Sequence, residues 1–278
     1  MLALFLLYPT LDIIRLSFAN ARLDTEQLSY SLDNYRILIT GKQFSGILFV
    51  TLIFVFFSVV FQLFLGFSVA RLIQAGEDRH LRGTLFVRTA VLTGWVIPGI
   101  IVGVVWNLLL TESRMGILNY WAESSGIGHI PFLSDPTWAL VSVIAANIWR
   151  GTAASMIMEY AGLKMLPREL HEAAVMDGAP FLKETFFVTI PAMRNIIFTN
   201  LVLISISTVN TFDSIIALTG GGPGRSTEVL ALSVYRTVFQ DFNLGRGAAT
   251  AVVLLIVNLI MTFIYSRIIR GDAEGSAA

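Results

Sequence analysis

Histidine and serine are the side chains with which this chain could perform nucleophilic chemistry, because it contains no cysteine. A serine or threonine nucleophile needs a base within hydrogen-bond reach. His80, His129 and His171 all fall in predicted loops, and neither a G-x-S-x-G nor an H-E-x-x-H pattern occurs. The serines of the apolar segments therefore lack a base, no metal site is indicated, and the chain is predicted not to be an enzyme.

The segment TGGGPGRST at residues 219–227 is the one stretch that could be mistaken for a phosphate-binding loop. Such a loop requires a second glycine five residues after the first, followed by lysine. Five residues after Gly220 stands Arg225, and no lysine follows it. A tight turn is therefore predicted in place of a nucleotide site.

Polar side chains within the apolar segments are the remaining candidates for chemistry. Asn147, Asn210 and Asp213 carry amide or carboxylate groups, and hydroxyls recur at Ser205, Thr208 and Thr211. Polar groups are costly in lipid and usually face the protein interior. They could hydrogen-bond neighbouring helices, which is preferred for the serines. The amides and carboxylate could instead bind a solute rich in hydroxyls. The ionisable residues predicted at membrane depth are Arg150 and Asp213, with Asp12 and Arg15 near one end.

Composition places these residues in a membrane protein. Hydrophobic residues make up 55% of the 278 residues and charged residues 14%, against about 25% charged in an ordinary soluble domain. The net charge is zero, so no basic field indicates nucleic acid. The length suits one polytopic domain, residues 1–278.

Six apolar segments predict an all-α integral membrane protein with six transmembrane helices, since about 20 residues cross the hydrocarbon. The first lacks the basic region of a signal peptide. The third contains Pro98, which a membrane helix tolerates when neighbours satisfy its carbonyls. GDAEGSAA at the end is predicted to be disordered. The predicted spans are residues 2–18, 46–73, 89–110, 138–158, 195–218 and 247–269.

Basic residues predict the orientation of these spans. They concentrate in the loops after the second and fourth spans and beside the last span. The positive-inside rule therefore places both termini and the loop at residues 160–194 in the cytoplasm.

This loop is the longest polar interruption of the apolar pattern. Pro167 suits a first helical turn. Gly178 stands where a left-handed residue ends a helix, with Pro180 just beyond. A second short helix is predicted from Phe181 to Val188, before Pro191 opens the next span. The sequence thus predicts a helix, a glycine corner and a second helix on a membrane surface. Its Ala173 and Ala174 would leave a bare patch for a partner, and Asp177 would need a compensating charge.

The loop resembles the EAA loop of ABC-importer permeases, which docks into the ATPase subunit. The matching residues are Glu172, Ala173, Ala174, Asp177, Gly178 and Ala179, with Ile190 and Pro191 downstream. The resemblance continues through YPTLDIIRLSF, LDNYRIL, WVIPGIIVGVVWNLLL, NIWRGTAASMIMEYAGLKMLP and TGGGPGRST. Together these segments are similar to the maltose- and glycerol-3-phosphate-type permeases of the carbohydrate-importer branch.

The resemblance implies a type I permease fold with a cytoplasmic coupling helix, in a bacterial or archaeal cytoplasmic membrane. It implies a second homologous permease, two ATPase subunits that bind ATP and Mg²⁺, an external solute-binding protein, surrounding lipid and a sugar-type substrate. No cofactor is expected on this chain. The implied sugar contacts are Asn147, Gly151, Thr208, Asn210 and Thr211, to which Asp213 is added from its position, and the implied binding-protein contacts are Gly221, Gly222 and Pro223. Thr208 and Thr211 replace asparagines of the maltose pattern, which leaves the sugar open.

Two other functions are compatible with the composition. A secondary, ion-coupled transporter also needs polar groups at the midplane, but such proteins often show internal repeats, and none is convincing here. A secondary transporter would not need the docking loop either. An ABC permease for a non-carbohydrate solute is the second alternative.

Overall fold

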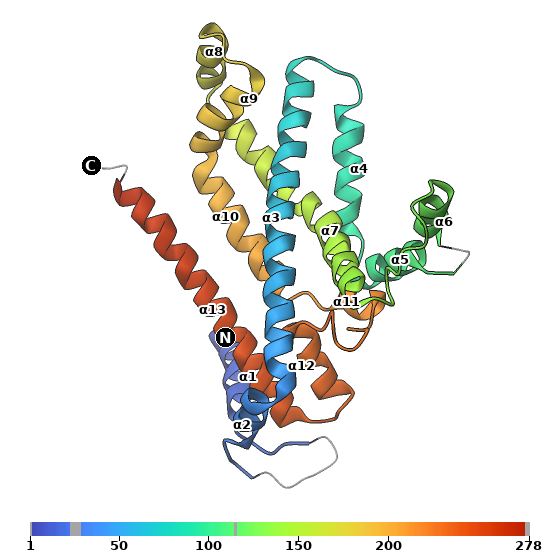
Figure 1. The fold of residues 1–278 in the computed structure, drawn as a ribbon. Coiled ribbons are helices and arrows are strands. Elements are labelled where there is room, and N and C mark those ends of the chain that lie inside the picture. Colours follow the sequence, from blue (N-terminus) through green and yellow to red (C-terminus); the bar gives the residue numbers. More distant parts are fainter. Residues whose placement is uncertain (1, 23–28, 114–115, 276–278) are drawn as a thin grey trace. The chain divides into compact units, whose positions relative to one another are not determined.

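The structure, a computed structural model, describes residues 2–22, 29–113 and 116–275. Within these ranges the regular elements are helices, and Ala19 and Tyr30 form an isolated β-bridge. The all-α prediction is confirmed. The elements are α1 (Leu2–Ser17), α2 (Asp33–Thr40), α3 (Lys42–Asp78), α4 (Thr84–Val96), α5 (Gly99–Leu110), α6 (Ile117–Ser124), α7 (Pro136–Met165), α8 (Arg168–Met176), α9 (Phe181–Glu184), the π-helix η1 (Thr185–Thr189), α10 (Ile190–Val209), α11 (Asp213–Leu218), α12 (Leu230–Phe239) and α13 (Leu244–Gly275) (Figure 1).

Four helical segments among the described residues are long and apolar enough to cross a membrane: Lys42–Asp78, Pro136–Met165, Phe181–Val209 and Leu244–Arg267. A fifth is counted if the broken pair α4 and α5 forms one span. α1 has only 16 residues, fewer than the roughly 20 that cross the hydrocarbon. The count of six spans therefore stays a prediction.

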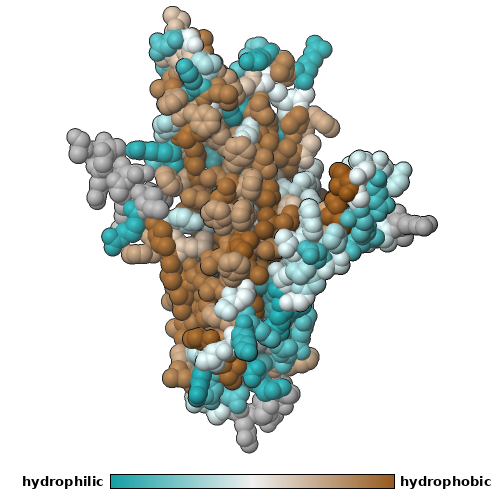
Figure 2. All heavy atoms as spheres, viewed as in Figure 1, coloured by the Kyte–Doolittle hydropathy of each residue, from teal (hydrophilic) through white to brown (hydrophobic). Residues whose placement is uncertain are grey.

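The flank of α3 is apolar and uncovered. Phe49, Phe64 and Leu72 are 64%, 63% and 64% exposed. On the face seen in Figure 2, hydrophobic side chains gather along the long helices, and hydrophilic ones lie over α8 and the turn between α3 and α4. Water-soluble monomers rarely expose such patches, so this surface fits lipid or a partner.

The predicted third span, residues 89–110, is broken into α4 and α5. Ile97 is extended, with φ −69° and ψ 127°, because the ring of Pro98 disfavours helical geometry in the residue before it. The helix restarts at Gly99.

The predicted fifth span, residues 195–218, was also misplaced. The helix starts at Phe181, passes through η1 and ends at Val209, where serine, threonine, valine and asparagine of low helix propensity accumulate. Ile190 N donates to Thr185 O five residues back. Pro191 cannot donate a backbone hydrogen bond and its ring crowds the carbonyl four residues earlier, so the wider π-turn carries the chain into α10. Pro191 therefore lies inside a continuous helical segment and does not mark the start of the span.

The last helix is longer than predicted. α13 runs to Gly275, so the disordered tail predicted from Gly271 is wrong for the described residues 271–275. Residues 276–278 lie outside the described residues.

The chain divides into two compact units. Unit 1 comprises Met1–Phe56, Gly99–Ala146 and Val209–Thr262, and unit 2 comprises Phe57–Pro98, Asn147–Thr208 and Phe263–Ala278. The core of unit 1 is built around Phe54, Leu110, Ile215 and Leu232. The core of unit 2 is built around Ala70, Ile73, Met156, Leu163 and Met193.

In unit 1, α5 packs closely against α11 through two glycines. An added Cβ on Gly103 would overlap the carbonyl oxygen of Ser214 and lie 2.7 Å from the Cβ of Ala217. An added Cβ on Gly99 would overlap the carboxylate of Asp213. Small residues four apart let membrane helices approach closely. Asp213 thereby lies at the N-terminus of α5, where a carboxylate is favoured by the helix dipole.

We expect Gly103→Ala to destabilise unit 1 by about 1–3 kcal/mol, the usual cost of overpacking. Gly46→Ala is the matched control, because no atom lies within 4 Å of its added Cβ and alanine is favoured over glycine in helices by about 0.5–1 kcal/mol. Thermal unfolding of the purified protein in detergent measures both. Equal melting temperatures would contradict the close α5–α11 packing.

Candidate functional site

The loop at residues 160–194 folds as the helix, glycine corner and helix that the sequence predicts. Gly178 has φ +70°. Its N–H donates to Val175 O at 3.0 Å, and Ala179 N donates to Ala174 O at 2.9 Å. These two bonds form a Schellman motif that closes the end of α8. Pro180 is extended, and α9 begins at Phe181. We call α8, residues 177–180 and α9 the coupling corner.

The coupling corner presents most, but not all, of the residues expected at its surface. Glu172, Ala173, Asp177 and Gly178 are exposed. Ala174 is only 6% exposed, so the bare patch predicted from two alanines reduces to Ala173. Successive residues of a helix point about 100° apart, and Ala174 takes the inward direction.

Large apolar side chains are exposed on both sides of Gly178 in the sequence of the coupling corner. Val175, Met176 and Leu182 are 57%, 87% and 66% exposed. They lie on a loop that sequence reasoning places outside the membrane, where clustered exposed apolar groups mark an interaction surface. Sequence reasoning missed them. The sequence signal that could have revealed this surface is the apolar pair Val175 and Met176, which stands in a polar loop between Ala174 and Asp177.

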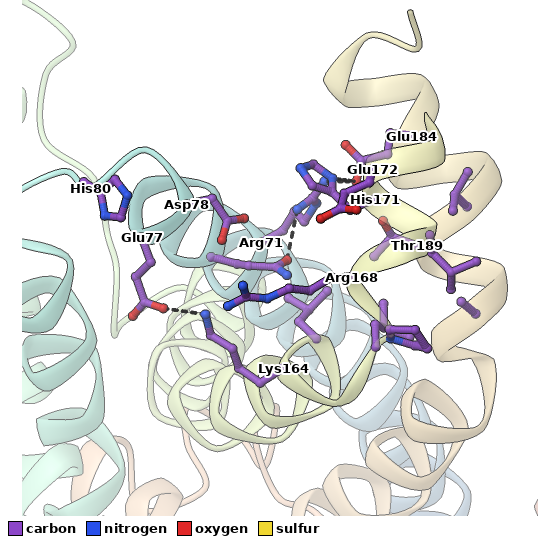
Figure 3. Close-up of a pocket in the computed structure, with 17 residues that line it drawn as sticks. Arg71, Glu77, Asp78, His80, Lys164, Arg168, His171, Glu172, Glu184 and Thr189 are labelled. Carbon is purple, nitrogen blue, oxygen red and sulfur yellow. Dashed lines mark hydrogen bonds and ion pairs between the residues drawn. The ribbon is translucent and has the colours of Figure 1, made fainter. Parts of the chain in front are cut away.

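Behind α8 lies a cleft of about 550 Å³ within unit 2. It is lined by the ends of α3 and α7 and by α8, α9 and η1 (Figure 3). Charged and polar side chains dominate it, chiefly Arg71, Glu77, Lys164, His171, Glu172 and Glu184. Among the described residues, no three His, Asp or Glu side chains gather closely enough to hold a metal ion.

A buried ion pair, between Arg71 and Glu184, lines this cleft. Arg71 NH2 of α3 lies 2.6 Å from Glu184 Oε1, and the two side chains are 5% and 7% exposed. Arg71 Nε also donates to Thr185 Oγ1 at 3.3 Å, and its guanidinium lies 4.7 Å from the centre of the Phe181 ring. Removing one partner of a buried pair typically costs about 3–5 kcal/mol. α3 is thereby fixed to α9, the second helix of the coupling corner.

The same carboxylate also contacts α8, the first helix of the coupling corner. His171 Nδ1 of α8 lies 2.8 Å from Glu184 Oε1, the oxygen that also contacts Arg71. Sequence reasoning assigned no role to these three residues, because they are 100 and 13 positions apart and follow no shared pattern.

A second charged cluster joins α3, α4 and α7. Glu77 contacts Lys164 Nζ at 2.7 Å and Arg88 NH1 at 3.8 Å, and it accepts a hydrogen bond from Tyr160 Oη at 2.7 Å. It is more open than the buried pair, with side-chain exposures of 25% for Glu77 and 43% for Lys164. Partly exposed pairs contribute little, about 0–1 kcal/mol.

Three predicted sugar contacts lie in unit 2. Asn147 is 6% exposed, and its backbone carbonyl accepts from Gln62 Nε2 at 3.1 Å. Its side-chain Nδ2 has no hydrogen-bond partner among the described residues. An added Cβ on Gly151 would lie 2.5 Å from Gln62 Nε2, so Gly151 makes room for Gln62. Thr208 is buried, with 3% exposure.

The other predicted sugar contacts lie in unit 1. Asn210 is exposed, and its Nδ2 donates to Asn258 Oδ1 at 3.1 Å. Thr211 is 8% exposed and stands beyond the end of α10. The hydroxyl series through Ser205, Thr208 and Thr211 is therefore not one helix face, because the helix ends at Val209. The role of Asn210, Thr211 and Asp213 in binding a sugar remains a prediction, as does that of the three residues in unit 2.

A buried carboxylate was missed. Glu159 is 0% exposed and accepts from Asn200 Nδ2 at 2.8 Å, and the same amide contacts Ser155 Oγ at 2.8 Å. The predicted fourth span stopped at residue 158, which put Glu159 in a loop. α7 continues to Met165, so Glu159 joins Arg150 and Asp213 as an ionisable residue within a long apolar helix or next to one.

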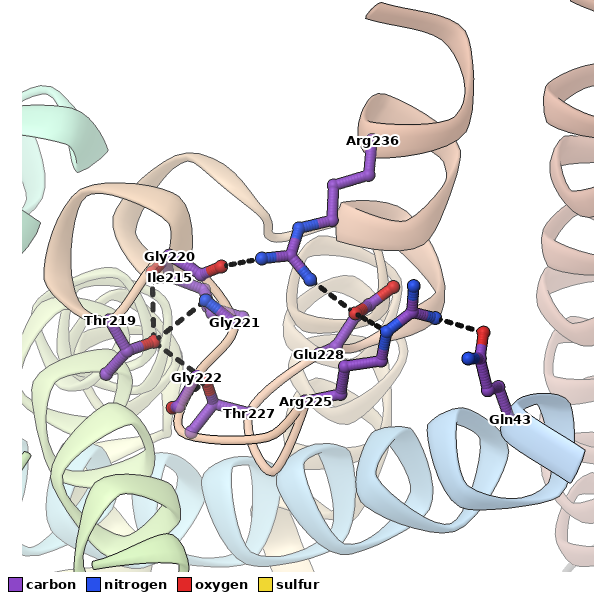
Figure 4. A network of polar contacts seen from close by, with 10 residues as sticks. All are labelled: Gln43, Ile215, Thr219, Gly220, Gly221, Gly222, Arg225, Thr227, Glu228 and Arg236. Carbon is purple, nitrogen blue, oxygen red and sulfur yellow. Dashed lines mark hydrogen bonds and ion pairs between the residues drawn. The ribbon is translucent and has the colours of Figure 1, made fainter. Parts of the chain in front are cut away.

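The glycine-rich segment is the predicted tight turn, held by a buried carboxylate (Figure 4). Glu228 is 2% exposed at its side chain and lies 2.6 Å from Arg236 and 3.5 Å from Arg225. Thr227 Oγ1 donates to Gly222 O at 3.0 Å. Gly221 is buried, with φ +86°.

Exposure at this turn differs from the sequence expectation. Gly222 and Pro223 are half-buried, whereas Gly224 and Arg225 are exposed. The contact role predicted for Gly221, Gly222 and Pro223 stays a prediction, and Gly224 and Arg225 are the residues of the turn that a partner would meet first.

Comparison with known proteins gives a consistent set of relatives. Residues 72–271 match the family described as binding-protein-dependent transport system inner membrane component. The chain is 31% identical to the trehalose/maltose transport system permease protein MalF of Thermococcus litoralis, covering 86% of this chain and 79% of that one. It is 31% identical to the sn-glycerol-3-phosphate transport system permease protein UgpA of Agrobacterium fabrum, covering 86% and 80%.

Solved structures share the fold. A chain in the crystal structure of a bacterial ABC transporter that imports the acidic polysaccharide alginate aligns with a TM-score of 0.80 and 23% identity, covering 96% of this chain and 91% of that one. A chain of the alginate transporter in complex with its alginate pentasaccharide-bound periplasmic protein aligns with a TM-score of 0.80 and 22% identity, covering 95% and 88%.

Proposed function

The chain belongs to the family of binding-protein-dependent transport system inner membrane components, and we propose that it is a permease subunit of an ATP-driven importer for a sugar or sugar derivative. It would form half of the translocation pathway. The observation that carries this proposal is the coupling corner, a closed helical turn that exposes Glu172 and Met176 on a loop between apolar helices. The named relatives favour this function over a secondary transporter.

The coupling corner would dock into a separate ATPase subunit that binds ATP and Mg²⁺. Glu172 and Asp177 would meet basic groups of the ATPase, and Met176 would fill an apolar pocket. The glycine at residue 178 fixes the direction in which α9 leaves α8. The docking set is Glu172, Ala173, Ala174, Asp177, Gly178 and Ala179, of which Ala174 would act by packing inward. No chemical step is required of this chain, which would convert ATPase closure into a movement of its helices.

The substrate would be bound by amides at membrane depth. An amide that lacks a partner in hydrocarbon costs several kcal/mol, so the buried Nδ2 of Asn147 calls for a ligand. A sugar hydroxyl can accept from an amide N–H and donate to an amide oxygen. The proposed contacts are Asn147, Gly151, Thr208, Asn210, Thr211 and Asp213. An ABC permease for another hydroxyl-rich solute would need the same groups.

The proposed partners correspond to three surfaces. A second permease and lipid would cover the apolar flank of α3. An external binding protein would meet the glycine-rich turn at Gly224 and Arg225, beside Gly221, Gly222 and Pro223. Two ATPase subunits would serve the two permeases, one at each coupling corner.

The first prediction tests docking. Glu172→Lys should lower transport and substrate-stimulated ATPase activity of the reconstituted importer by roughly tenfold or more, because like charges facing each other across an interface cost several kcal/mol. Glu123→Lys makes the same charge change on α6, at an exposed position, and should leave both rates unchanged. Normal coupling in well-expressed Glu172→Lys would refute the docking assignment.

Orientation is tested separately. We propose that both termini and the coupling corner are cytoplasmic, from the distribution of basic residues. The chain has no cysteine, so Glu169→Cys and Glu123→Cys, both at exposed positions, can be labelled without background. An impermeant thiol reagent should label Glu123→Cys from outside and Glu169→Cys only in inverted vesicles. Labelling of both from one side would overturn the topology.

The substrate assignment is tested at Asn147. Asn147→Ala should weaken the apparent affinity several-fold, since one hydrogen bond contributes roughly 0.5–1.5 kcal/mol, and it should change relative transport rates among related sugars. Asn200→Ala is the matched control, because this buried amide is already paired with Glu159 and Ser155. It should lower the yield of intact complex without changing sugar preference. If Asn147→Ala behaves like Asn200→Ala, Asn147 is a structural amide.

A further inference from the structure

Glu184, the last residue of α9, contacts both the helix α8 and the long apolar helix α3. His171 Nδ1 of α8 and Arg71 NH2 of α3 lie 2.8 Å and 2.6 Å from the same oxygen, Glu184 Oε1. Figure 3 shows the three side chains converging at the cleft. We call Arg71, Glu184 and His171 the Glu184 joint.

α8 has few other means of transmitting movement. It is a helix of nine residues, bounded by Pro167 on one side and by the left-handed Gly178 on the other. Among its residues, only Ala174 is buried. A rigid-body displacement of α8 could therefore be absorbed at its two ends unless a side chain fixes it to the body of unit 2.

We propose that the Glu184 joint transmits the displacement of the coupling helix α8 to α3, and that His171 is the positioning residue through which α8 engages it. The proposal rests on the docking function proposed above. When the ATPase displaces α8, the His171–Glu184 hydrogen bond carries the load to Glu184, and the buried ion pair carries it to Arg71 on α3. His171 stands next to Glu172, so force at the docking residue enters the joint one residue away.

The chemistry of the joint suits this role. A carboxylate only accepts hydrogen bonds, so Nδ1 of His171 must carry a proton in this arrangement. Arg71 is held on several sides, because it also contacts Gln74 Oε1 at 2.9 Å, Thr185 Oγ1 at 3.3 Å and the Phe181 ring. Charge-assisted hydrogen bonds are the stronger ones. The His171 side chain is 47% exposed, so it is the accessible end of a joint whose other two members are buried.

The Glu77 cluster provides the comparison within the same cleft. Its contacts join α3 to α4 and α7 through Lys164, Arg88 and Tyr160, and none of these residues belongs to α8. A variant there perturbs charge in the cleft without cutting the path from α8 to α3.

The test uses the complete importer reconstituted in proteoliposomes, together with its solute-binding protein and a sugar that the unmodified importer transports. His171→Leu removes the donor at similar size, whereas His171→Asn keeps an N–H donor near the position of Nδ1. Glu77→Gln is the control. Transport rate and ATP hydrolysis are measured together, because their ratio reports coupling and is insensitive to the amount of folded complex.

We expect His171→Leu to lower the number of sugars transported per ATP by roughly 2- to 30-fold, the range for residues that carry coupling between sites. His171→Asn should restore most of the ratio, and Glu77→Gln should match the unmodified protein. Glu184→Gln should also lower the ratio, and adding His171→Leu to it should have little further effect, since both changes weaken one contact.

Two results would overturn the inference. One is an unchanged ratio in His171→Leu, and the other is a loss of bound ATPase in that variant with a normal ratio in the remaining complex, which would place His171 in the docking surface. Glu172→Lys separates the two proposals. If it uncouples the importer while His171→Leu does not, only the joint is wrong; if neither has an effect, the docking function itself fails.

Discussion

Hydrocarbon offers no water to unsatisfied polar groups, and this constraint applies to the irregular turns within the long apolar segments. The break at Ile97 and Pro98 is followed at once by α5, whose N-terminus lies against the carboxylate of Asp213. The π-turn at Thr185–Thr189 lets Pro191 enter a helix without a boundary. At the π-turn, the backbone N–H of Ile190 keeps a partner in the carbonyl oxygen of Thr185.

The same constraint sorts the buried side chains. The Nδ2 of Asn200 donates to Glu159 and Ser155, and the Nε2 of Gln62 donates to the carbonyl of Asn147. The Nδ2 of Asn147 has no partner among the described residues. An amide that donates to a neighbouring helix holds the two helices together. The unused donor of Asn147 is the feature on which its proposed contact with a solute rests.

Elsewhere in unit 2, the coupling corner exposes the residues that we propose to dock into an ATPase. The coupling corner is local in origin, because its Schellman bonds lie within six residues. Its attachment is not local, since it depends on Arg71, more than 100 positions before Glu184. A corner closed by its own hydrogen bonds and joined to α3 by a buried ion pair is suited to the proposed response to a separate ATPase.

The sequence by itself determined the class, the long helices and the coupling corner, because these depend on local properties. Apolar length predicts spans, and Pro167, Gly178 and Pro180 predict the turn. It could not determine where helices end, so residues 195–218 were misplaced and Glu159 was assigned to a loop. Which side chains meet was decided by the tertiary structure alone. Ala174 is buried, Gln62 packs against Gly151, and Arg71 and His171 contact the same oxygen of Glu184. Such contacts depend on the packing of segments far apart in the chain, so they leave no periodic signal in the sequence.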